Sequence, residues 1–202
     1  MKTGKLKENK GVSLVELLIV IIILGILAGA GIPGYGRFAA KNRVRRAATE
    51  LMQNMRMVRT MAIKENRTYL ITLNPATNEY RLGFDTNGNG SLADTGVDVY
   101  GQGPVREIDV QEEYGANVVF GESTFPVIHP PNGPNGIAIS EQSSFRFMAD
   151  SSTSPNGMIY FQENNRGYTF CVELANSSGK TNLFMWDGDE DNTGVTTWTE
   201  LR

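Results

Sequence analysis

The chain has 202 residues, 40% of them hydrophobic and 20% charged, so it can bury a core and is not disordered throughout. Its single cysteine, Cys171, and single histidine, His129, exclude an intrachain disulfide and zinc sites built from several Cys or His ligands. The net charge of −3 conceals a division, because residues 1–11 carry +3, residues 12–65 carry +5 and residues 66–202 carry −11.

A long apolar segment follows the basic N-terminal residues. Residues 12–32 contain only two strongly polar side chains, Ser13 and Glu16, and about 20 apolar residues in a helix cross the hydrocarbon core of a membrane. A secretory signal peptide is the alternative, but its apolar region usually runs for only about 7–15 residues before a cleavage site of small residues. The longer run predicts a transmembrane helix over residues 12–32.

Glu16 is the one charge within this segment. A carboxylate at the centre of a membrane helix costs roughly 2.5–3.5 kcal/mol on insertion scales, and less near the helix end, where Glu16 lies. Either the side chain reaches the lipid headgroups, or a cation of another chain neutralises it. Lys and Arg flank the segment on both sides, so the charge distribution does not decide its orientation.

Residues 10–17, which read Lys-Gly-Val-Ser-Leu-Val-Glu-Leu, resemble the type IV prepilin signature, in which a short basic leader ends in glycine. The resemblance implies that residues 1–11 are a cytoplasmic leader and that a prepilin peptidase cuts after Gly11. It also implies that Val12 becomes the N-methylated mature N-terminus, with the head beyond the bacterial inner membrane. Glu16 would pair with the terminal amine of a neighbouring subunit, which satisfies both charges and sets the register of a helical stack.

Pro33 follows the apolar segment and stands among several glycines. Proline removes a helical hydrogen bond and kinks or interrupts a helix, and pilin-like proteins resemble this arrangement at the foot of their exposed helix. Gly25 and Gly29 form a small-xxx-small pair that permits close helix approach, although glycine is common in membrane helices in any case. The candidate assembly residues are Glu16, Gly25, Gly29 and Pro33.

Residues 33–65 are predicted to form an amphipathic helical stem. Apolar residues recur at spacings of three and four and make one face that we expect to pack on the rest of the protein. These residues are Ala47, Ala48, Leu51, Met55, Val58 and Ala62. Arginines occupy much of the remainder, either as a solvated face or against anionic lipid headgroups.

Helical periodicity ends near Asn66, and residues 66–202 are typical of a β-rich periplasmic head. Short apolar or alternating runs are separated by Gly, Asn, Pro and Ser turn signals. The predicted strands are 68–73, 80–84, 105–110, 117–120, 145–148, 158–162, 168–174 and 182–186. In the run 168–174 the aromatic and aliphatic residues share one parity, which predicts one apolar face. The predicted fold class is therefore α+β, a pilin-like fold with a long N-terminal helix packed on antiparallel β-sheets.

This order of parts resembles the GspH/FimT group of minor pseudopilins and minor pilins. The likeness covers most of the chain and is strongest over residues 8–36. Major pilins usually carry a C-terminal disulfide loop, which a single cysteine cannot make. Cys171 is therefore expected to be an inert, buried strand residue.

Residues 85–90, which read Asp-Thr-Asn-Gly-Asn-Gly, match the first half of an EF-hand calcium loop. The bidentate Glu expected at the twelfth position is missing, because Gly96 stands there, so Asp94 or Asp98 would have to substitute. The same pattern also fits an ordinary turn. The candidate calcium ligands are Asp85, Asn87, Asn89 and Asp98, and no other cofactor is expected. A second acidic run, at residues 187–192, lacks the glycine at its sixth position and is interpreted as a solvated loop.

Catalytic and nucleic-acid-binding functions find no support in the sequence. His129 lies in a proline-rich loop, and no Gly-x-Ser-x-Gly elbow occurs, so an enzyme is not expected. Binding to the phosphate backbone needs clustered Lys and Arg, whereas the head is strongly acidic, so no nucleic-acid partner is expected.

The sequence therefore predicts a structural subunit, a protein H-like minor pseudopilin of a type II secretion system, in a periplasmic filament that supports export of folded proteins. One alternative is a FimT/FimU-like minor pilin that primes or caps a type IV pilus. Another is a signal-anchored periplasmic binding or hydrolytic protein. The expected partners are other pseudopilins or minor pilins through the N-terminal helix, prepilin peptidase, the inner membrane and exported cargo.

Overall fold

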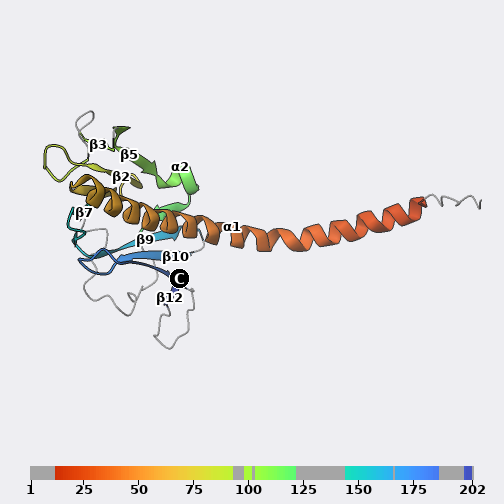
Figure 1. The fold of residues 1–202 in the computed structure, drawn as a ribbon. Coiled ribbons are helices and arrows are strands. Elements are labelled where there is room, and N and C mark those ends of the chain that lie inside the picture. The colour runs from red at the N-terminus through yellow and green to blue at the C-terminus, as the bar shows by residue number, and fades with distance from the viewer. Residues whose placement is uncertain are drawn as a thin grey trace, which may run out of the picture. The chain divides into compact units, whose positions relative to one another are not determined.

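A computed structural model describes residues 12–92, 98–101, 103–121, 144–165, 167–186 and 198–201, apart from the side chains of residues 28 and 30–34. The chain divides into two compact units, Met1–Ala39 and Ala40–Arg202. One helix, α1 (Leu14–Glu65), contributes residues to both units (Figure 1).

The start of α1 is set by Ser13, whose Oγ accepts a hydrogen bond from the backbone N–H of Glu16 at 3.2 Å. Serine followed three residues later by glutamate is a helix-start signature. The helix then continues through Pro33 to Glu65, so the expectation that Pro33 interrupts it is wrong. Proline removes only one backbone hydrogen-bond donor, and the many remaining hydrogen bonds of this 52-residue helix maintain it. A kink at Pro33 stays a prediction.

The second unit contains two antiparallel sheets in the described part of the chain. The first sheet has the order β4-β3-β2-β1-β7-β8, and β5 also pairs with β2. Its strands are β1 (Tyr69–Asn74), β2 (Glu79–Phe84), β3 (Val99–Tyr100), β4 (Gly103–Pro104), β5 (Arg106–Asp109), β7 (Ser144–Phe147) and β8 (Thr153–Ser154). The second sheet has the order β12-β11-β10-β9-β6. Its strands are β6 (Val118–Phe120), β9 (Gly157–Glu163), β10 (Thr169–Leu174), β11 (Thr181–Trp186) and β12 (Trp198–Leu201).

All eight predicted strands are present, each displaced by at most one residue at either end, and the α+β fold class is confirmed. Sequence reasoning missed the short strands β3, β4, β8 and β12, because two to four residues carry too little pattern. It also missed a short helix, α2 (Val110–Tyr114), although Asp109 gives a start signal. The Asp109 side chain accepts hydrogen bonds from the backbone N–H groups of Gln111 and Glu112 at 2.8 and 3.0 Å.

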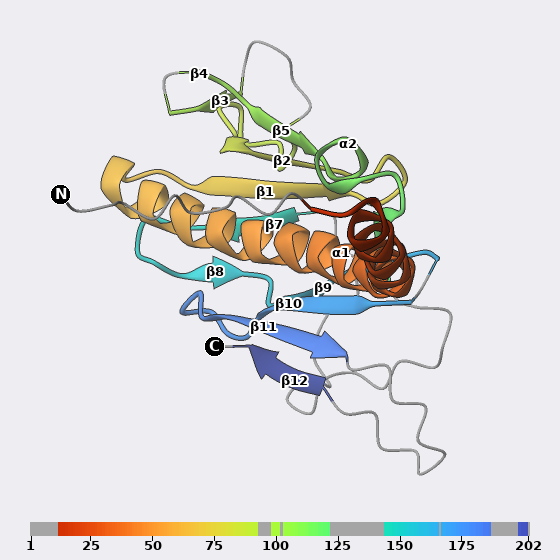
Figure 2. The same cartoon turned by 90° about the vertical axis from the view of Figure 1, so that its right-hand side faces the viewer.

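The C-terminal half of α1 lies between the two sheets and forms the centre of the head (Figure 2). The predicted apolar face is confirmed, since Ala47, Leu51, Met55, Val58 and Ala62 are all fully buried. The same core includes aromatic residues of both sheets. Among the largest of these side chains are Tyr69, Tyr80, Phe145, Phe147, Phe161 and Phe170.

The predicted alternation of β10 is confirmed, and all six of its residues are buried. Phe170, Val172 and Leu174 face the main core. Cys171 belongs to a second cluster with Tyr160 and Phe184 on the other face of the sheet. Cys171 is thus a buried strand residue, as the sequence predicts. The second sheet is therefore covered on both sides here.

Met55→Ala is expected to lower the free energy of unfolding by about 2–5 kcal/mol, because it leaves a cavity in the core. Met57 lies on the same helix but is 38% exposed. Met57→Ala should therefore stay within about 0.5 kcal/mol of the wild type. Chemical denaturation of the full chain in detergent micelles measures both, and equal losses for the two variants would contradict this arrangement of the helix.

Candidate functional site

The first unit carries a continuous apolar helix surface. Its large hydrophobic side chains from Val12 to Leu27 each expose at least half of their surface, and Leu14 exposes 80%. Soluble monomers rarely show so large an apolar area, which marks a surface for contact with another protein or with a membrane. A helix that is apolar on all sides needs such a partner.

No helix in the described part of the chain is both long and apolar enough to span a membrane.

Glu16 lies in the first turn of α1, where the positive end of the helix dipole favours a carboxylate. Its side chain is exposed among apolar neighbours, and Val12 nearby is 71% exposed. Gly11 and the rest of the predicted leader lie outside the described residues. The structure therefore shows Glu16 exposed on the apolar segment and does not describe the cleavage site.

Gly25 and Gly29 both face open space within this chain. A Cβ atom added to either one would meet no heavy atom within 4 Å. The pair therefore offers an unobstructed backbone surface to an approaching helix. The side chain of Pro33, the remaining candidate assembly residue, lies outside the described residues.

Two arginines of the helical stem donate hydrogen bonds to the head. The Nε of Arg56 donates to Thr181 Oγ1 at 2.9 Å, at the start of β11. The Nε of Arg59 donates to the backbone carbonyl of Ser151 at 3.3 Å. The expectation of a purely solvated or lipid-facing arginine face is therefore wrong for these two residues. Nothing local in the sequence signals these contacts, since Thr181 lies 125 residues beyond Arg56.

Glu50 joins the stem to the first sheet on the other side of the helix. Its carboxylate accepts a hydrogen bond from the Tyr114 hydroxyl and pairs with Arg106 Nη2 at 3.3 Å. Burial, followed by the hydrogen bond to Glu50, raises the pKa of Tyr114 well above its usual value. A cavity of about 310 Å³ opens beside this group. It is lined by Glu50, Arg106, Glu107, Ile108, Asp109, Glu112 and Glu113. The side chains of this cavity are mostly acidic and favour cationic groups.

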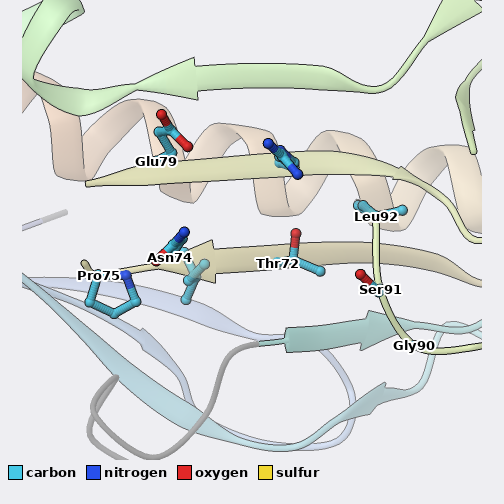
Figure 3. Close-up of a pocket in the computed structure, with 9 residues that line it drawn as sticks. Thr72, Asn74, Pro75, Glu79, Gly90, Ser91 and Leu92 are labelled. Carbon is cyan, nitrogen blue, oxygen red and sulfur yellow. The ribbon is translucent and has the colours of Figure 1, made fainter. Parts of the chain in front are cut away.

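A second cavity of about 390 Å³ lies over β1 and β2, on the face of the first sheet that the loop 85–92 partly covers (Figure 3). Its lining residues are Thr72, Leu73, Asn74, Pro75, Glu79, Arg81, Gly90, Ser91 and Leu92. Arg81 is engaged by Glu107, with Nε and Oε2 3.1 Å apart. This lining combines hydrogen-bonding groups with apolar surface from Leu73, Pro75 and Leu92.

The candidate calcium loop is wrapped around Asp85. One oxygen of Asp85 accepts hydrogen bonds from the backbone N–H groups of Gly88 and Asn89, and the other accepts from Gly90 at 2.6 Å. The side-chain oxygens of Asn87 and Asn89 each accept from the backbone N–H two residues further on. Asp98, the fourth candidate ligand, is 2% exposed and accepts from the backbone N–H of Thr86 at 3.1 Å. The structure thus brings Asp98 to the first turn of the loop.

Several candidate residues lie outside the described residues, namely His129, Asp94, Gly96 and the acidic run 187–192. Within the part of the chain that is described, no three His, Cys, Asp or Glu side chains gather in a way that could hold a metal ion. Of the four candidate calcium ligands, only Asp85 and Asp98 are carboxylates, and the other two are asparagines.

Comparison with known protein families confirms both resemblances drawn from the sequence. The family model for the type II transport protein GspH matches residues 47–178. The model for the prokaryotic N-terminal methylation motif matches residues 6–32.

Curated relatives match over shorter stretches. The chain is 35% identical to a fimbrial protein of Pseudomonas aeruginosa over 79 residues, which is 39% of this chain and 51% of the relative. It is 29% identical to the type IV major fimbrial protein FimA of Dichelobacter nodosus over 123 residues, which is 60% of this chain and 78% of the relative. The chain thus spans about half the length of the first of these relatives.

Two solved structures are similar at low sequence identity. The type IV minor pilin FimU of Pseudomonas aeruginosa aligns with a TM-score of 0.48 and 16% identity, covering 72% of this chain and 91% of that one. The minor pseudopilin EpsH from the type 2 secretion system of Vibrio cholerae aligns with a TM-score of 0.47 and 10% identity, covering 71% and 97%.

The head is expected to lose stability as the pH rises from about 10 to 12. Burial, followed by the hydrogen bond to Glu65, raises the pKa of Tyr69 from 10.0 to about 12. The unfolded chain therefore loses this proton first, so the contribution is complete below pH 10 and is lost as the pH rises through 12. Denaturation at a series of pH values should show a shallower loss for Tyr69→Phe and no change for Tyr35→Phe, because Tyr35 is 74% exposed. Equal pH profiles for Tyr69→Phe and the wild type would contradict this.

Proposed function

The chain belongs to the type II transport protein GspH family, and we propose that it is a minor pseudopilin of a type II secretion system. In this role it is a structural, non-enzymatic subunit of a periplasmic filament that supports export of folded proteins. The observation that carries the proposal is the combination of an N-terminal methylation motif over residues 6–32 with a GspH-type head over residues 47–178.

The proposed maturation removes residues 1–11. Prepilin peptidase cuts after Gly11 and methylates the new amine of Val12. Support comes from the methylation motif and from the position of Val12, which is exposed two residues before the start of α1. The cut leaves Ser13 in position to cap the helix, so the mature chain retains the helix start.

The proposed assembly contact joins Glu16 of one subunit to the N-terminal amine of the next. Glu16 supports this contact because its carboxylate is exposed among apolar side chains that become buried in a packed filament. An unpaired charge in such surroundings is costly, and a pair satisfies both partners. Because the pair forms in only one axial arrangement, it also fixes the register between neighbouring helices. Gly25 and Gly29 permit their close approach.

Before assembly, the apolar segment 12–32 holds the subunit in the bacterial inner membrane as a single-pass protein. The leader then faces the cytoplasm and the head faces the periplasm, where the acidic cavity near α2 offers a docking surface for neighbouring subunits or exported cargo. The negative charge of the head disfavours nucleic acid as a partner.

A minor pilin that primes or caps a type IV pilus is the second candidate function. The match to a fimbrial protein favours it, with 35% identity over 79 residues. Deletion of the gene separates the two roles. Loss of protein export with intact pili supports the secretion role, and loss of pili with intact export supports the pilus role.

Substitution of Gly11 is expected to block processing. The intact mass of the wild-type protein from its native membranes should correspond to residues 12–202 plus one methyl group, whereas Gly11→Val should keep residues 1–11 and remain unmethylated. Gly4→Val, in the same leader, serves as the matched control and should be processed normally. An uncut wild-type chain would instead support a signal-anchored periplasmic protein.

Glu16→Gln is expected to separate assembly from folding. The variant should be processed and reach the membrane with a folded head, but it should no longer co-precipitate with other filament subunits from solubilised membranes. Glu200→Gln is the control, because Glu200 is also exposed but lies on β12 of the head and does not line the acidic cavity. Co-precipitation of Glu16→Gln at the wild-type level would exclude the proposed pair.

A further inference from the structure

We propose that the head binds one calcium ion at the loop between β2 and β3, with Asp85, Asn87, Asn89 and Asp98 as side-chain ligands. This inference is independent of the filament that the protein joins. It rests on a buried carboxylate oxygen, on the pairing of two strand ends and on the oxygen chemistry of the loop.

The buried carboxylate is that of Asp98, which is only 2% exposed. One of its oxygens accepts a hydrogen bond from the backbone N–H of Thr86. The other oxygen, Oδ2, is buried and has no hydrogen-bond donor among the described residues. A buried carboxylate oxygen without a partner costs free energy, and a cation at this position would offset that cost.

The register of β2 and β3 brings Asp98 close to the start of the loop. Phe84, the last residue of β2, pairs with Val99, the first residue of β3. Asp85 directly follows β2 and Asp98 directly precedes β3, so the two residues lie next to this paired position. The hydrogen bond from the backbone N–H of Thr86 to Asp98 Oδ1 also links the two chain segments at this point.

The conformation of the loop suits a cation bound at alternating positions. Asp85, Asn87 and Asn89 occupy the first, third and fifth positions of the EF-hand pattern, and Gly90 occupies the sixth with φ of +81°. Asp85 Oδ2 accepts one backbone hydrogen bond and has a second lone pair, and the side-chain oxygens of Asn87 and Asn89 each accept from the backbone N–H two residues further on. These contacts alone also fit an ordinary turn. The buried Oδ2 of Asp98, which lacks a hydrogen-bond donor among the described residues, favours a calcium site over a simple turn.

The ligand chemistry selects calcium and sets its affinity. Calcium takes six to eight oxygen ligands in a flexible geometry, whereas magnesium demands a near-ideal octahedron and keeps several waters. The described ligands include only two carboxylates, and the guanidinium of Arg146 lies close, with Nη2 3.0 Å from the point where a Cβ on Gly90 would stand. We therefore expect a dissociation constant of about 10⁻⁴–10⁻³ M, the class of extracellular calcium modules.

Calcium bound here would hold one wall of the larger cavity. Gly90, Ser91 and Leu92 continue directly from the loop and line that cavity over β1 and β2 (Figure 3). Leu92 is also 3% exposed, so the loop covers part of the outer face of the sheet. Calcium binding would thus fix the position of Gly90, Ser91 and Leu92, and with it the shape of this cavity on the surface of the subunit.

The test is a titration of the full chain in detergent micelles after treatment with a chelator. Calorimetry with CaCl₂ should show one site in the stated range, and the melting temperature of the head should rise with calcium but not with the same concentration of MgCl₂. No heat and no change in melting temperature at 5–10 times the upper expected dissociation constant, about 10⁻² M, would overturn the proposal.

Two variants and one control make the test specific to the site. Asp98→Asn should weaken calcium binding at least tenfold, whereas Asp150→Asn removes an exposed carboxylate elsewhere and should bind as the wild type does. Asn89→Asp adds a third carboxylate and should tighten binding about tenfold. This gain keeps the test decisive if Asp98→Asn fails to fold. Equal affinity in the wild type, Asp98→Asn and Asn89→Asp would show that calcium binds elsewhere and would overturn the assignment.

Discussion

The burial of one face of α1 between two sheets is the constraint on which the head depends. Each sheet presents aromatic side chains to the helix, and neither sheet could keep them from water alone. The helix meets them with small residues such as Ala47 and Ala48, which allow close approach, and with Leu51 and Met55, which fill the remaining space. The hydrophobic effect supplies the free energy of this arrangement because the whole face leaves water on folding.

Polar contacts decide how the helix is aligned across the sheets. The hydrophobic effect is non-directional, so the apolar face by itself tolerates some rotation and sliding. Arg56 ties the helix to β11 of the second sheet, and Glu50 ties it to Tyr114 and Arg106 beside the first sheet. These contacts leave opposite sides of the same helix and reach both sheets. They explain why the arginines and glutamates of the stem are not interchangeable surface charges.

The same helix meets two different kinds of surroundings along its length. In the head, apolar residues occupy one face and polar contacts flank it, whereas from Val12 to Leu27 large hydrophobic side chains are exposed all round. A helix of the first kind completes a globular core, and one of the second kind needs a membrane or other helices. The proposed filament role joins these two requirements in one element. The proposed calcium loop connects β2 to β3, so the pairing of these two strands, and not packing against the helix, sets its geometry.

Local patterns in the sequence determined the end of the helix at Glu65, its buried face, eight strands and the N-terminal processing motif. These features follow from periodicities of 3.6 and 2 residues and from short motifs, each contained within a few turns of chain. Only the tertiary structure decided which strands pair, that β10 is covered on both faces, and that Asp98 accepts a hydrogen bond from the backbone N–H of Thr86. Those outcomes depend on residues far apart in sequence, as with Arg56 and Thr181, whose contact arises only when the helix and sheets pack together.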